Sequence, residues 1–315
     1  MKSLVIDGQF KILQITDIHI GNSFLCRSTD RKALAAVEQL IARTEPDLIA
    51  VTGDICYAIP YRTATKDNLT PLKQFASVME ATGLPWAPVF GNHDAESFST
   101  HTREQLGEYL QTQPHCLFEA GETSGCGNYA VSLKTADKAE RAVLLFLDSG
   151  GYKENKKGFF GLYATYDVFR EDQIDWCRRT LVSRLTEGRI PPSLAFFHIP
   201  LWEYEDAWEC AREGKPEAVL HYGEKNERAA VAFERSPMFE ELRKLGTKGI
   251  FCGHDHTNTY SVTYRGVRLT YGMSIDYFAY PFISFRKRQR GGTLITVGED
   301  GAFDCEPIPL KAEEK

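Results

Sequence analysis

The chain has 315 residues, of which 43% are hydrophobic and 25% are charged, and its formal net charge is −6. This composition is typical of a folded globular protein and excludes a largely disordered chain. The excess of acidic residues gives no electrostatic basis for a stable nucleic-acid partner.

Hydropathy and cysteine spacing indicate the compartment. No apolar run approaches the roughly 18 residues of a membrane span. The first residues include Lys2, Asp7 and Lys11 in place of the apolar core of a secretory signal. The eight cysteines are scattered without a C-x-x-C pair, which predicts free thiols. We therefore expect a protein that does not bind membranes and is cytoplasmic, with a removed targeting signal as the alternative.

Apolar, β-rich runs alternate with helical patterns in the first half of the chain, and strands dominate its end. The predicted strands are 10–16, 48–52, 86–90, 128–134, 142–148, 194–198, 249–252, 259–264, 267–271 and 293–297. The predicted helices are 30–43, 70–82, 102–111, 170–187 and 237–245. This order predicts a layered α/β sandwich of the α+β type, in one domain with mixed sheets.

Three of these helices carry specific expectations at their ends. Thr29 or Asp30 is the expected N-cap of the first helix, because both side chains can accept a hydrogen bond from the first turn. Thr70 and Pro71 form a cap followed by a proline at the first helical position. The helix over 170–187 is the longest, and its spacing places Leu185 on the buried face.

Metal-binding residue types follow five predicted strands at the point where each strand ends. The five segments are Asp17-Ile18-His19, Gly53-Asp54, Gly91-Asn92-His93-Asp94, His198 and Gly253-His254-Asp255-His256. Open α/β sheets place ligand sites beyond their strand ends, so these segments are expected to converge. The alternative is that these residues are turn formers and caps, which explains one or two segments but not the set.

The number of donor side chains favours two metal ions over one. Two aspartates, one asparagine and four or five histidines exceed what a single tetrahedral zinc with an open position needs. They suit two ions that share a carboxylate, the arrangement used for phosphoryl chemistry. Imidazole and carboxylate ligands favour transition metals, with Fe, Zn and Mn as the main candidates.

The ordered set of five segments resembles the calcineurin-like metallophosphoesterase superfamily. The segments FKILQITDIHIG, LAFFHIPLWEY and GIFCGHDHTN resemble more narrowly its Dcr2 and purple-acid-phosphatase-29-like branch. The resemblance covers about residues 10–300. It implies a four-layer αββα sandwich with two mixed β-sheets in a single domain, 1–315, and a dinuclear metal centre.

The resemblance also implies a role for each residue of the motifs. The implied ligands are Asp17, His19 and His256 for the first ion, Asn92, His198 and His254 for the second, and Asp54 as the bridge. His93 would lie outside the metal shell and donate a proton or hydrogen bond to the phosphoester. Asp94 would orient His93.

Tyr57 is a departure from the general pattern. Gly53-Asp54-Ile55-Cys56-Tyr57 fits the G-D-x-x-Y motif of purple acid phosphatases, in which the tyrosine binds ferric iron. Those enzymes usually lack the histidine of the D-x-H motif, whereas this chain has His19. We expect Tyr57 to lie outside the metal shell, with direct ligation as the alternative.

The implied activity is hydrolysis of small-molecule phosphomonoesters by metal-activated water. A phosphodiesterase, acting for example on cyclic nucleotides, is the alternative, because the walls of the pocket select the ester. A metal-binding interaction module without turnover is a third hypothesis, although such relatives usually lose ligands or the histidine of the G-N-H motif. The sequence leaves the oligomeric state open.

Two aromatic stretches carry weaker signals. Trp202–Tyr222 follows a ligand strand, so residues 202–235 are expected to form either a substrate lid or an insertion anchored by its aromatic rings. Tyr277, Phe278, Tyr280 and Phe282 follow the last ligand segment. They are expected to pack in the core or to stack on an aryl group or base.

Overall fold

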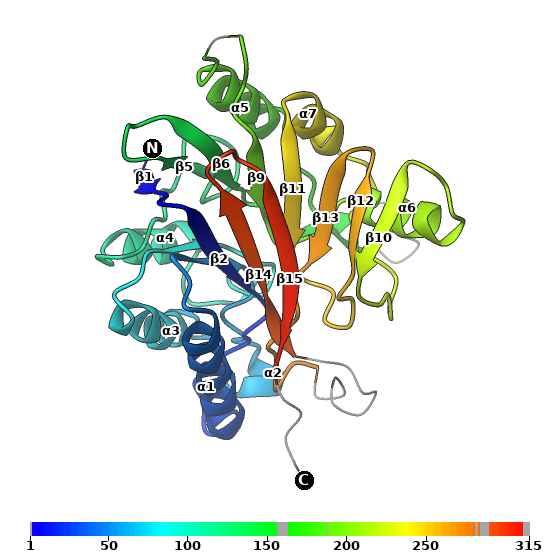
Figure 1. Ribbon diagram of the computed structural model, residues 1–315. Coiled ribbons are helices and arrows are strands. Elements are labelled where there is room, and N and C mark those ends of the chain that lie inside the picture. The colour runs from blue at the N-terminus through cyan, green and yellow to red at the C-terminus, as the bar shows by residue number, and fades with distance from the viewer. Residues whose placement is uncertain (1, 156–162, 187, 281–282, 284–289, 311–315) are drawn as a thin grey trace.

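The strands of the protein form two large sheets and a separate two-stranded hairpin. The computed structural model describes residues 2–155, 163–186, 188–280, 283 and 290–310 (Figure 1). The strands are β1 Lys2–Val5, β2 Gln9–Ile15, β3 Leu48–Thr52, β4 Trp86–Val89, β5 Tyr129–Lys134, β6 Glu140–Phe146, β7 Tyr152–Asn155, β8 Tyr163–Tyr166, β9 Ser193–Phe196, β10 Ala218–Tyr222, β11 Thr247–Cys252, β12 Ser261–Tyr264, β13 Val267–Tyr271, β14 Gly291–Gly298 and β15 Phe303–Pro309. The helices are α1 Arg27–Thr44, α2 Pro60–Thr63, α3 Leu69–Ala81, α4 Arg103–Gln111, α5 Glu171–Val182, α6 Trp202–Arg212 and α7 Met238–Lys244.

Both large sheets are mixed, as the sequence predicts. The larger sheet has the strand order β1-β5-β6-β9-β11-β13-β12-β10, and the smaller has the order β15-β14-β2-β3-β4. Strands β6, β9, β11 and β13 are mutually parallel, as are β2, β3 and β4. The carboxyl ends of each parallel set therefore gather at one edge of its sheet, where open α/β sheets hold their ligands.

The two sheets pack face to face, and the helices cover their outer faces. Figure 1 shows α1, α3 and α4 on one flank and α5, α6 and α7 on the other. Alternate residues of β6 point in opposite directions: Leu144 and Phe146 join the core that contains α1, α3 and the smaller sheet, whereas Val143 and Leu145 join the core under α5, α6 and α7. The four-layer αββα arrangement is thereby confirmed.

A row of aromatic rings runs across neighbouring strands on the inner face of the larger sheet. The ring centroids of Tyr129 and Phe146 are 5.0 Å apart, those of Phe146 and Phe196 are 5.0 Å apart, and those of Phe196 and Phe251 are 5.1 Å apart. Phe251 also contacts Phe303 of the smaller sheet, at 6.0 Å. Because interiors are close-packed, this row sets how the two strand-end edges lie relative to each other.

All ten predicted strands are present, each within two residues of its expected ends. The sequence analysis missed β1, β7, β8, β10 and β15, and the helices α2 and α6. Strands β1 and β10 are edge strands whose side chains are mostly exposed, so they lack the alternating apolar pattern that reveals a half-buried strand. Hydropathy reveals strands through their buried side chains, so exposed edge strands escape prediction.

The first helix begins at Arg27, three residues before the predicted start, and Asp30 lies inside its first turn. The Thr29 hydroxyl donates to the carbonyl of Cys26, which is already the N-cap. The Asp30 carboxylate accepts the backbone N–H groups of Gly21 and Asn22. Asp30, one of the two predicted caps, therefore stabilises the loop before α1 and does not cap the helix.

Two further helix ends differ from prediction. The Asp67 carboxylate accepts the backbone N–H groups of Leu69 and Thr70, so that α3 begins at Leu69 and Thr70 is inside the helix. Helix α5 ends at Val182, and Leu185, predicted on the buried face, is 53% exposed. The apolar spacing of the sequence continues past Val182, although the helix ends there.

Two simpler expectations concern the cysteines and the membrane. All eight cysteines are unpaired, as predicted. Among the described helices, none combines the length and the apolar character that a bilayer-crossing segment needs.

The aromatic row predicts where the fold is most sensitive. Phe196 is fully buried and stacks on a ring at each face. Phe196→Ala is expected to lower the free energy of unfolding by about 3–5 kcal/mol, because the cavity removes contacts from both neighbours. Denaturant titration measures this. The control Phe24→Ala, at a side chain that is 77% exposed, should change it by less than about 0.5 kcal/mol. Equal losses in the two variants would contradict the inter-sheet role.

Candidate metal centre

The five ligand-bearing segments lie together where the parallel strands of both sheets end. Backbone hydrogen bonds join them: the N–H of Asp17 donates to Gly53 (3.1 Å), and that of Gly253 donates to His198 (3.1 Å). The His198 imidazole reaches from the larger sheet to the smaller, where its Nδ1 donates to the carbonyl of Thr52 (2.8 Å). The structure therefore brings together all seven side chains predicted as ligands.

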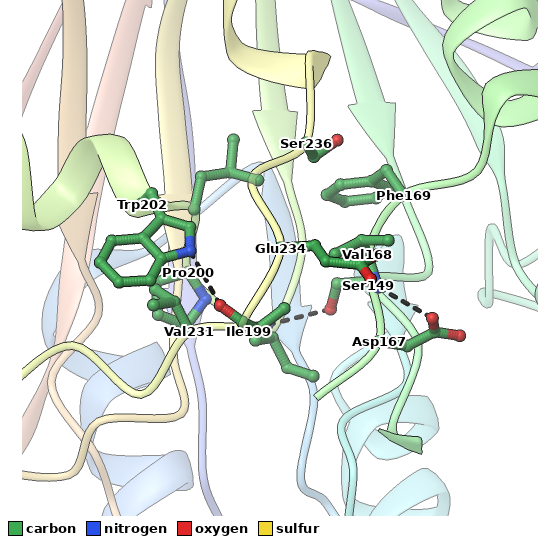
Figure 2. Close-up of a pocket in the computed structure, with 12 residues that line it drawn as sticks. Ser149, Asp167, Val168, Phe169, Ile199, Pro200, Trp202, Val231, Glu234 and Ser236 are labelled. Atoms are coloured by element: carbon green, nitrogen blue, oxygen red, sulfur yellow. Dashed lines mark hydrogen bonds between the residues drawn. The ribbon is translucent and has the colours of Figure 1, made fainter. Parts of the chain in front are cut away.

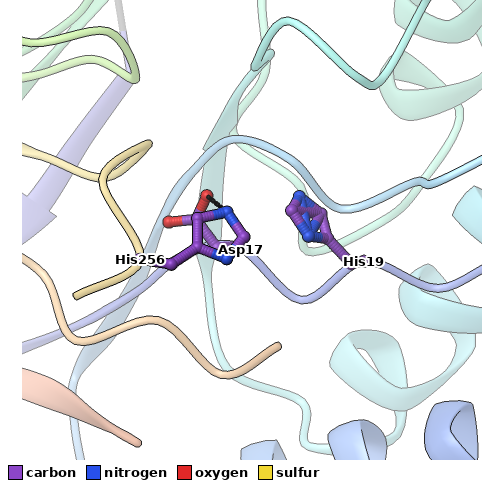
Figure 3. Close-up of side chains that lie close together, drawn as sticks. All are labelled: Asp17, His19 and His256. Atoms are coloured by element: carbon purple, nitrogen blue, oxygen red, sulfur yellow. Dashed lines mark ion pairs between the residues drawn. The ribbon is translucent and has the colours of Figure 1, made fainter. Parts of the chain in front are cut away.

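One half of the cluster consists of Asp17, His19 and His256. Their ligand atoms lie within 4.8 Å of one another, and Figure 3 shows Asp17 and His256 in contact beside His19. Asp17 Oδ1 lies 3.4 Å from His256 Nε2. Although both are buried, Asp17 Oδ1 and His19 Nδ1 have no hydrogen-bond partner. Buried acceptors without partners are costly unless a cation completes them.

The other half consists of Asp54, His198, His254 and Asn92. The ligand atoms of the first three lie within 4.8 Å of one another. Asn92 Oδ1 is 3.2 Å from His198 Nε2, and His254 Nδ1 is 3.3 Å from that same nitrogen. Because His198 Nδ1 donates to a carbonyl, the lone pair of neutral His198 Nε2 points into this group of acceptors. This donor set fits a transition-metal ion.

Asp54 connects the two halves through a single oxygen. Its Oδ2 lies 3.1 Å from His19 Nε2 and 3.2 Å from His198 Nε2. Its Oδ1 accepts the backbone N–H of His93 (2.8 Å), which fixes the plane of the carboxylate. One oxygen between the imidazoles of two half-sites is the geometry that a bridging ligand needs.

The family follows from comparison with known proteins. Residues 10–258, which include all five ligand segments, match the family model of the calcineurin-like phosphoesterases. The chain belongs to this family.

Individual relatives align with different fractions of this chain and of their own length. It is 32% identical to a protein named probable inactive purple acid phosphatase 28 of Arabidopsis thaliana, over 90% of this chain and 75% of that one. It is 31% identical to phosphatase DCR2 of Saccharomyces cerevisiae, over 81% of this chain but 45% of that longer protein. A dimetal phosphatase structure from Danio rerio, 14% identical, aligns with a TM-score of 0.59 over 97% of this chain and 100% of that one. This last likeness supports the fold.

Strained backbone holds the ligands of this phosphoesterase fold. Four of the seven side chains sit on residues with positive φ: Asp17 (52°), His19 (55°), Asp54 (52°) and His254 (76°). Such conformations cost about 1–3 kcal/mol each and persist where the surroundings over-determine them. The strand ends therefore turn sharply, so that consecutive polar side chains face the same point.

Two glycines allow the loops to approach each other. A Cβ on Gly91 would lie 2.1 Å from Asp54 Oδ1, and one on Gly53 would lie 2.7 Å from His198 Nδ1. Gly53 also has a φ of 89°. No side chain fits between these loops, so the glycines before Asp54 and Asn92 are a requirement of the bridging geometry.

The structure corrects the role predicted for Asp94. Its two oxygens accept the backbone N–H groups of Asp54 (3.0 Å), Cys56 (2.8 Å) and Gly91 (2.7 Å). Asp94 thus braces the loop that carries the bridging carboxylate. The partner of His93 is Glu96, whose Oε1 lies 2.6 Å from His93 Nδ1. Because three buried backbone N–H groups donate to the Asp94 carboxylate, Asp94 is not the residue that orients His93. The sequence alone does not reveal these contacts.

Asp276 is a site residue that the sequence analysis missed. Its Oδ2 lies 3.1 Å from His256 Nδ1, which leaves His256 Nε2 to face Asp17. Its carboxylate also accepts the N–H of Phe278. The signal was available: Asp276 follows strand β13, which is parallel to β11 and ends at the same edge.

Burial and charge divide the histidines into two groups. Burial lowers the pKa of His19 to about 3 and lowers that of His254 well below its usual value, so both are neutral, the form that binds metal. Burial also lowers the pKa of His198, but the Asp54 carboxylate outweighs it and the pKa rises to about 9. The proton that His198 holds beside the Asp54 carboxylate occupies a position that a metal cation can take.

Tyr57 lies against the cluster. Its ring centroid is 5.0 Å from that of His19 and 5.1 Å from that of His93. Burial raises the pKa of Tyr57 to about 12, which favours the neutral phenol over the phenolate that binds iron. Its position outside the metal shell stays a prediction.

Phe278 and Tyr280, which follow the last ligand segment, lie at the site, whereas Tyr277 packs against the main hydrophobic core, the first of the two expectations. The ring of Tyr280 is 4.9 Å from that of His256, and Tyr280 is 46% exposed. The ring of Phe278 is 6.1 Å from that of Tyr57. Core packing, the first of the two expectations, is therefore wrong for Tyr280, and Phe282 lies outside the described residues.

The predicted lid over 202–235 divides into two parts. Residues 202–222 include α6 and the edge strand β10, and Tyr204 of α6 is fully buried in the core, so this part belongs to the sandwich. Residues 223–235 run past the site, where the N–H of Ala230 donates to Asp255 (3.2 Å). A lid role stays a prediction for this second part.

A small pocket separates this segment from the body of the protein (Figure 2). The indole of Trp202 donates to the carbonyl of Ala232 (2.8 Å), and the N–H of Ile199 donates to the Ser149 hydroxyl (2.9 Å). The pocket holds about 20 Å³, enough for one water. It is too small to receive a phosphoester.

The contact between Asp276 and His256 predicts a metal-dependent effect. Asp276→Asn keeps the shape of the side chain but removes the charge that supports His256, so the affinity of the first ion should fall about tenfold or more. Chelator competition and the metal content after dialysis measure this. Asp137→Asn, on an exposed turn, is the matched control and should bind metal as the wild type does. Unchanged competition in Asp276→Asn would remove the assigned role.

Proposed function

We propose that this chain is a dinuclear metal-dependent phosphoesterase that hydrolyses phosphomonoesters of small molecules. The observation that carries the proposal is the Asp54 oxygen between His19 Nε2 and His198 Nε2, at 3.1 and 3.2 Å. Two transition-metal ions, with Fe, Zn and Mn as candidates, suit these ligands. The phosphatase names of several relatives support the choice of substrate class.

The residues of the site have distinct tasks in this proposal. Asp17, His19 and His256 hold the first ion, Asn92, His198 and His254 hold the second, and Asp54 is shared. When bound, such a pair of ions polarises the phosphoryl group and activates water. Thr52 and Asp276 hold His198 and His256 with Nε2 toward the site.

His93 supplies the proton for the leaving group in this proposal. Its side chain is 20% exposed, so it can reach a substrate, and its backbone N–H is fixed to Asp54. Glu96 accepts a hydrogen bond from His93 Nδ1, which leaves Nε2 free to donate to the ester oxygen. The carboxylates of Asp54 and Glu96 outweigh burial and raise the pKa of His93, which favours the protonated donor.

Some plant relatives carry the word inactive in their names, which keeps a non-catalytic module as the opposing hypothesis. Every position that the proposed chemistry needs is occupied by a suitable residue in this chain, including Asn92 and His93. That completeness supports catalysis over metal binding alone.

The proposal is tested with a matched pair of esters. The metal-loaded protein should hydrolyse p-nitrophenyl phosphate with a kcat/KM at least about tenfold above that for bis-p-nitrophenyl phosphate. Removal of the metals should abolish turnover, and their return should restore it. A reversed preference identifies a phosphodiesterase, and metal-loaded protein that is inert toward both esters supports the non-catalytic module.

His93→Ala should lower kcat by about 10²–10⁴-fold while both ions stay bound. The loss should be larger for phenyl phosphate than for p-nitrophenyl phosphate, because the poorer leaving group needs the proton more. Glu96→Gln keeps the imidazole and should fall between the wild type and His93→Ala. His221→Ala, on the edge strand β10, is the control. Wild-type turnover in His93→Ala would end its role as a proton donor.

A further inference from the structure

The hairpin of β7 and β8 brings two tyrosines to the metal centre. Tyr152 and Tyr166 are directly paired across the two strands. Their rings stack with centroids 5.5 Å apart and planes inclined by 30°. Direct cross-strand partners project from the same face of a hairpin, so the register places both rings on one side.

The stacked pair spans the half-site of the second ion and the proton donor. The rings of Tyr166 and His254 are perpendicular, with centroids 4.5 Å apart and an interplanar angle of 89°. The ring of Tyr152 is 6.1 Å from that of His93. The Tyr152 hydroxyl accepts a hydrogen bond from Asn92 Nδ2 (2.9 Å), which also turns Asn92 Oδ1 toward His198.

Tyr152 combines a fixed position with an open surface. It is 45% exposed, although its hydroxyl is bonded and its ring rests on Tyr166. A ring that is already held in place loses little conformational freedom when it stacks on a ligand. Tyr57 also contacts His93 but is 5% exposed, so its surface is not available in the same way.

We propose that Tyr152, supported by Tyr166, binds the organic group of the substrate, and that preferred esters carry a planar aromatic ring at the ester oxygen or one methylene from it. This inference rests on the proposed function, because His93 places the leaving oxygen on the side of Tyr152. Because the Tyr152 ring lies 6.1 Å from the His93 ring, a short spacer is sufficient to join an ester oxygen at His93 to a ring stacked on Tyr152.

The experiment compares benzyl phosphate with cyclohexylmethyl phosphate. Both are esters of primary alcohols with similar leaving-group acidity, so the comparison isolates the planar ring. The wild type should show a kcat/KM about fivefold higher for the benzyl ester, the size of one aromatic stacking contact. The preference should persist in Tyr152→Phe, which keeps the ring, and should fall to about one in Tyr152→Leu.

Tyr280→Leu is the matched control. It removes a ring of equal exposure, 46%, that lies over His256 in the half-site of the first ion, so the benzyl preference should remain. Because Tyr152→Phe loses the hydrogen bond to Asn92 but keeps the ring, it separates the positioning of Asn92 from the binding of substrate. Metal content is measured for each variant.

The source of the aromatic ring is addressed with a second pair, adenosine 5′-monophosphate and ribose 5-phosphate. The base of the nucleotide is separated from the ester oxygen by the ribose, so a nucleotide preference that requires Tyr152 would contradict the short spacer, and its absence beside a benzyl preference assigns the ring to an aryl group near the ester. Equal kcat/KM for benzyl phosphate and cyclohexylmethyl phosphate in the wild type would overturn the proposal. A preference for benzyl phosphate that survives Tyr152→Leu would also overturn it.

A separate binding measurement distinguishes this failure from failure of the proposed function. If the metal-loaded protein hydrolyses no ester, the proposed function fails, and calorimetry with benzylphosphonate and cyclohexylmethylphosphonate still tests the ring contact. Tighter binding of the benzyl compound that is lost in Tyr152→Leu supports the contact. Equal affinities contradict it.

Discussion

The position of one carboxylate oxygen governs the architecture of the site. Asp54 Oδ2 has to face His19 and His198 at once, although these histidines follow strands of different sheets. The Asp54 backbone adopts a left-handed conformation to present it, and Asp94 braces the same loop through buried hydrogen bonds. Gly91 leaves the space into which the carboxylate fits. A side chain at Gly91 would collide with the Asp54 carboxylate and displace it.

The sandwich makes this arrangement possible because it fixes two sheet edges relative to each other. The aromatic row from Tyr129 to Phe251 lies on the inner face of the larger sheet and contacts Phe303 of the smaller one, and the hydrogen bond from His198 to the Thr52 carbonyl joins their strand ends. The strain of the ligand loops is local, whereas the packing that offsets it is spread over the core. The packed core therefore holds in place the loops that carry the charged side chains of the site.

The ligands and the walls of the site have separate origins. The proposed ligands sit on loops that directly follow sheet strands, in the region that matches the calcineurin-like phosphoesterase family. Tyr152 and Tyr166 instead come from a hairpin outside the two large sheets, and Tyr280 follows the last ligand segment. Side chains on such a hairpin can differ without moving the residues that follow the sheet strands.

The strand pattern was sufficient to predict ten of the fifteen described strands, and the residue types at strand ends were sufficient to predict the seven side chains that lie together where strands of both sheets end. Buried strands and their terminal turns are local properties, written in apolar runs and in short polar segments such as Gly91-Asn92-His93. The partners of those side chains were decided by tertiary structure. Glu96 in place of Asp94 beside His93, Asp276 beside His256 and Tyr152 beside Asn92 each depend on which way a loop turns. Such contacts join residues through space, and the energy that selects them comes from burial and hydrogen bonding that exist only once the sheets have packed.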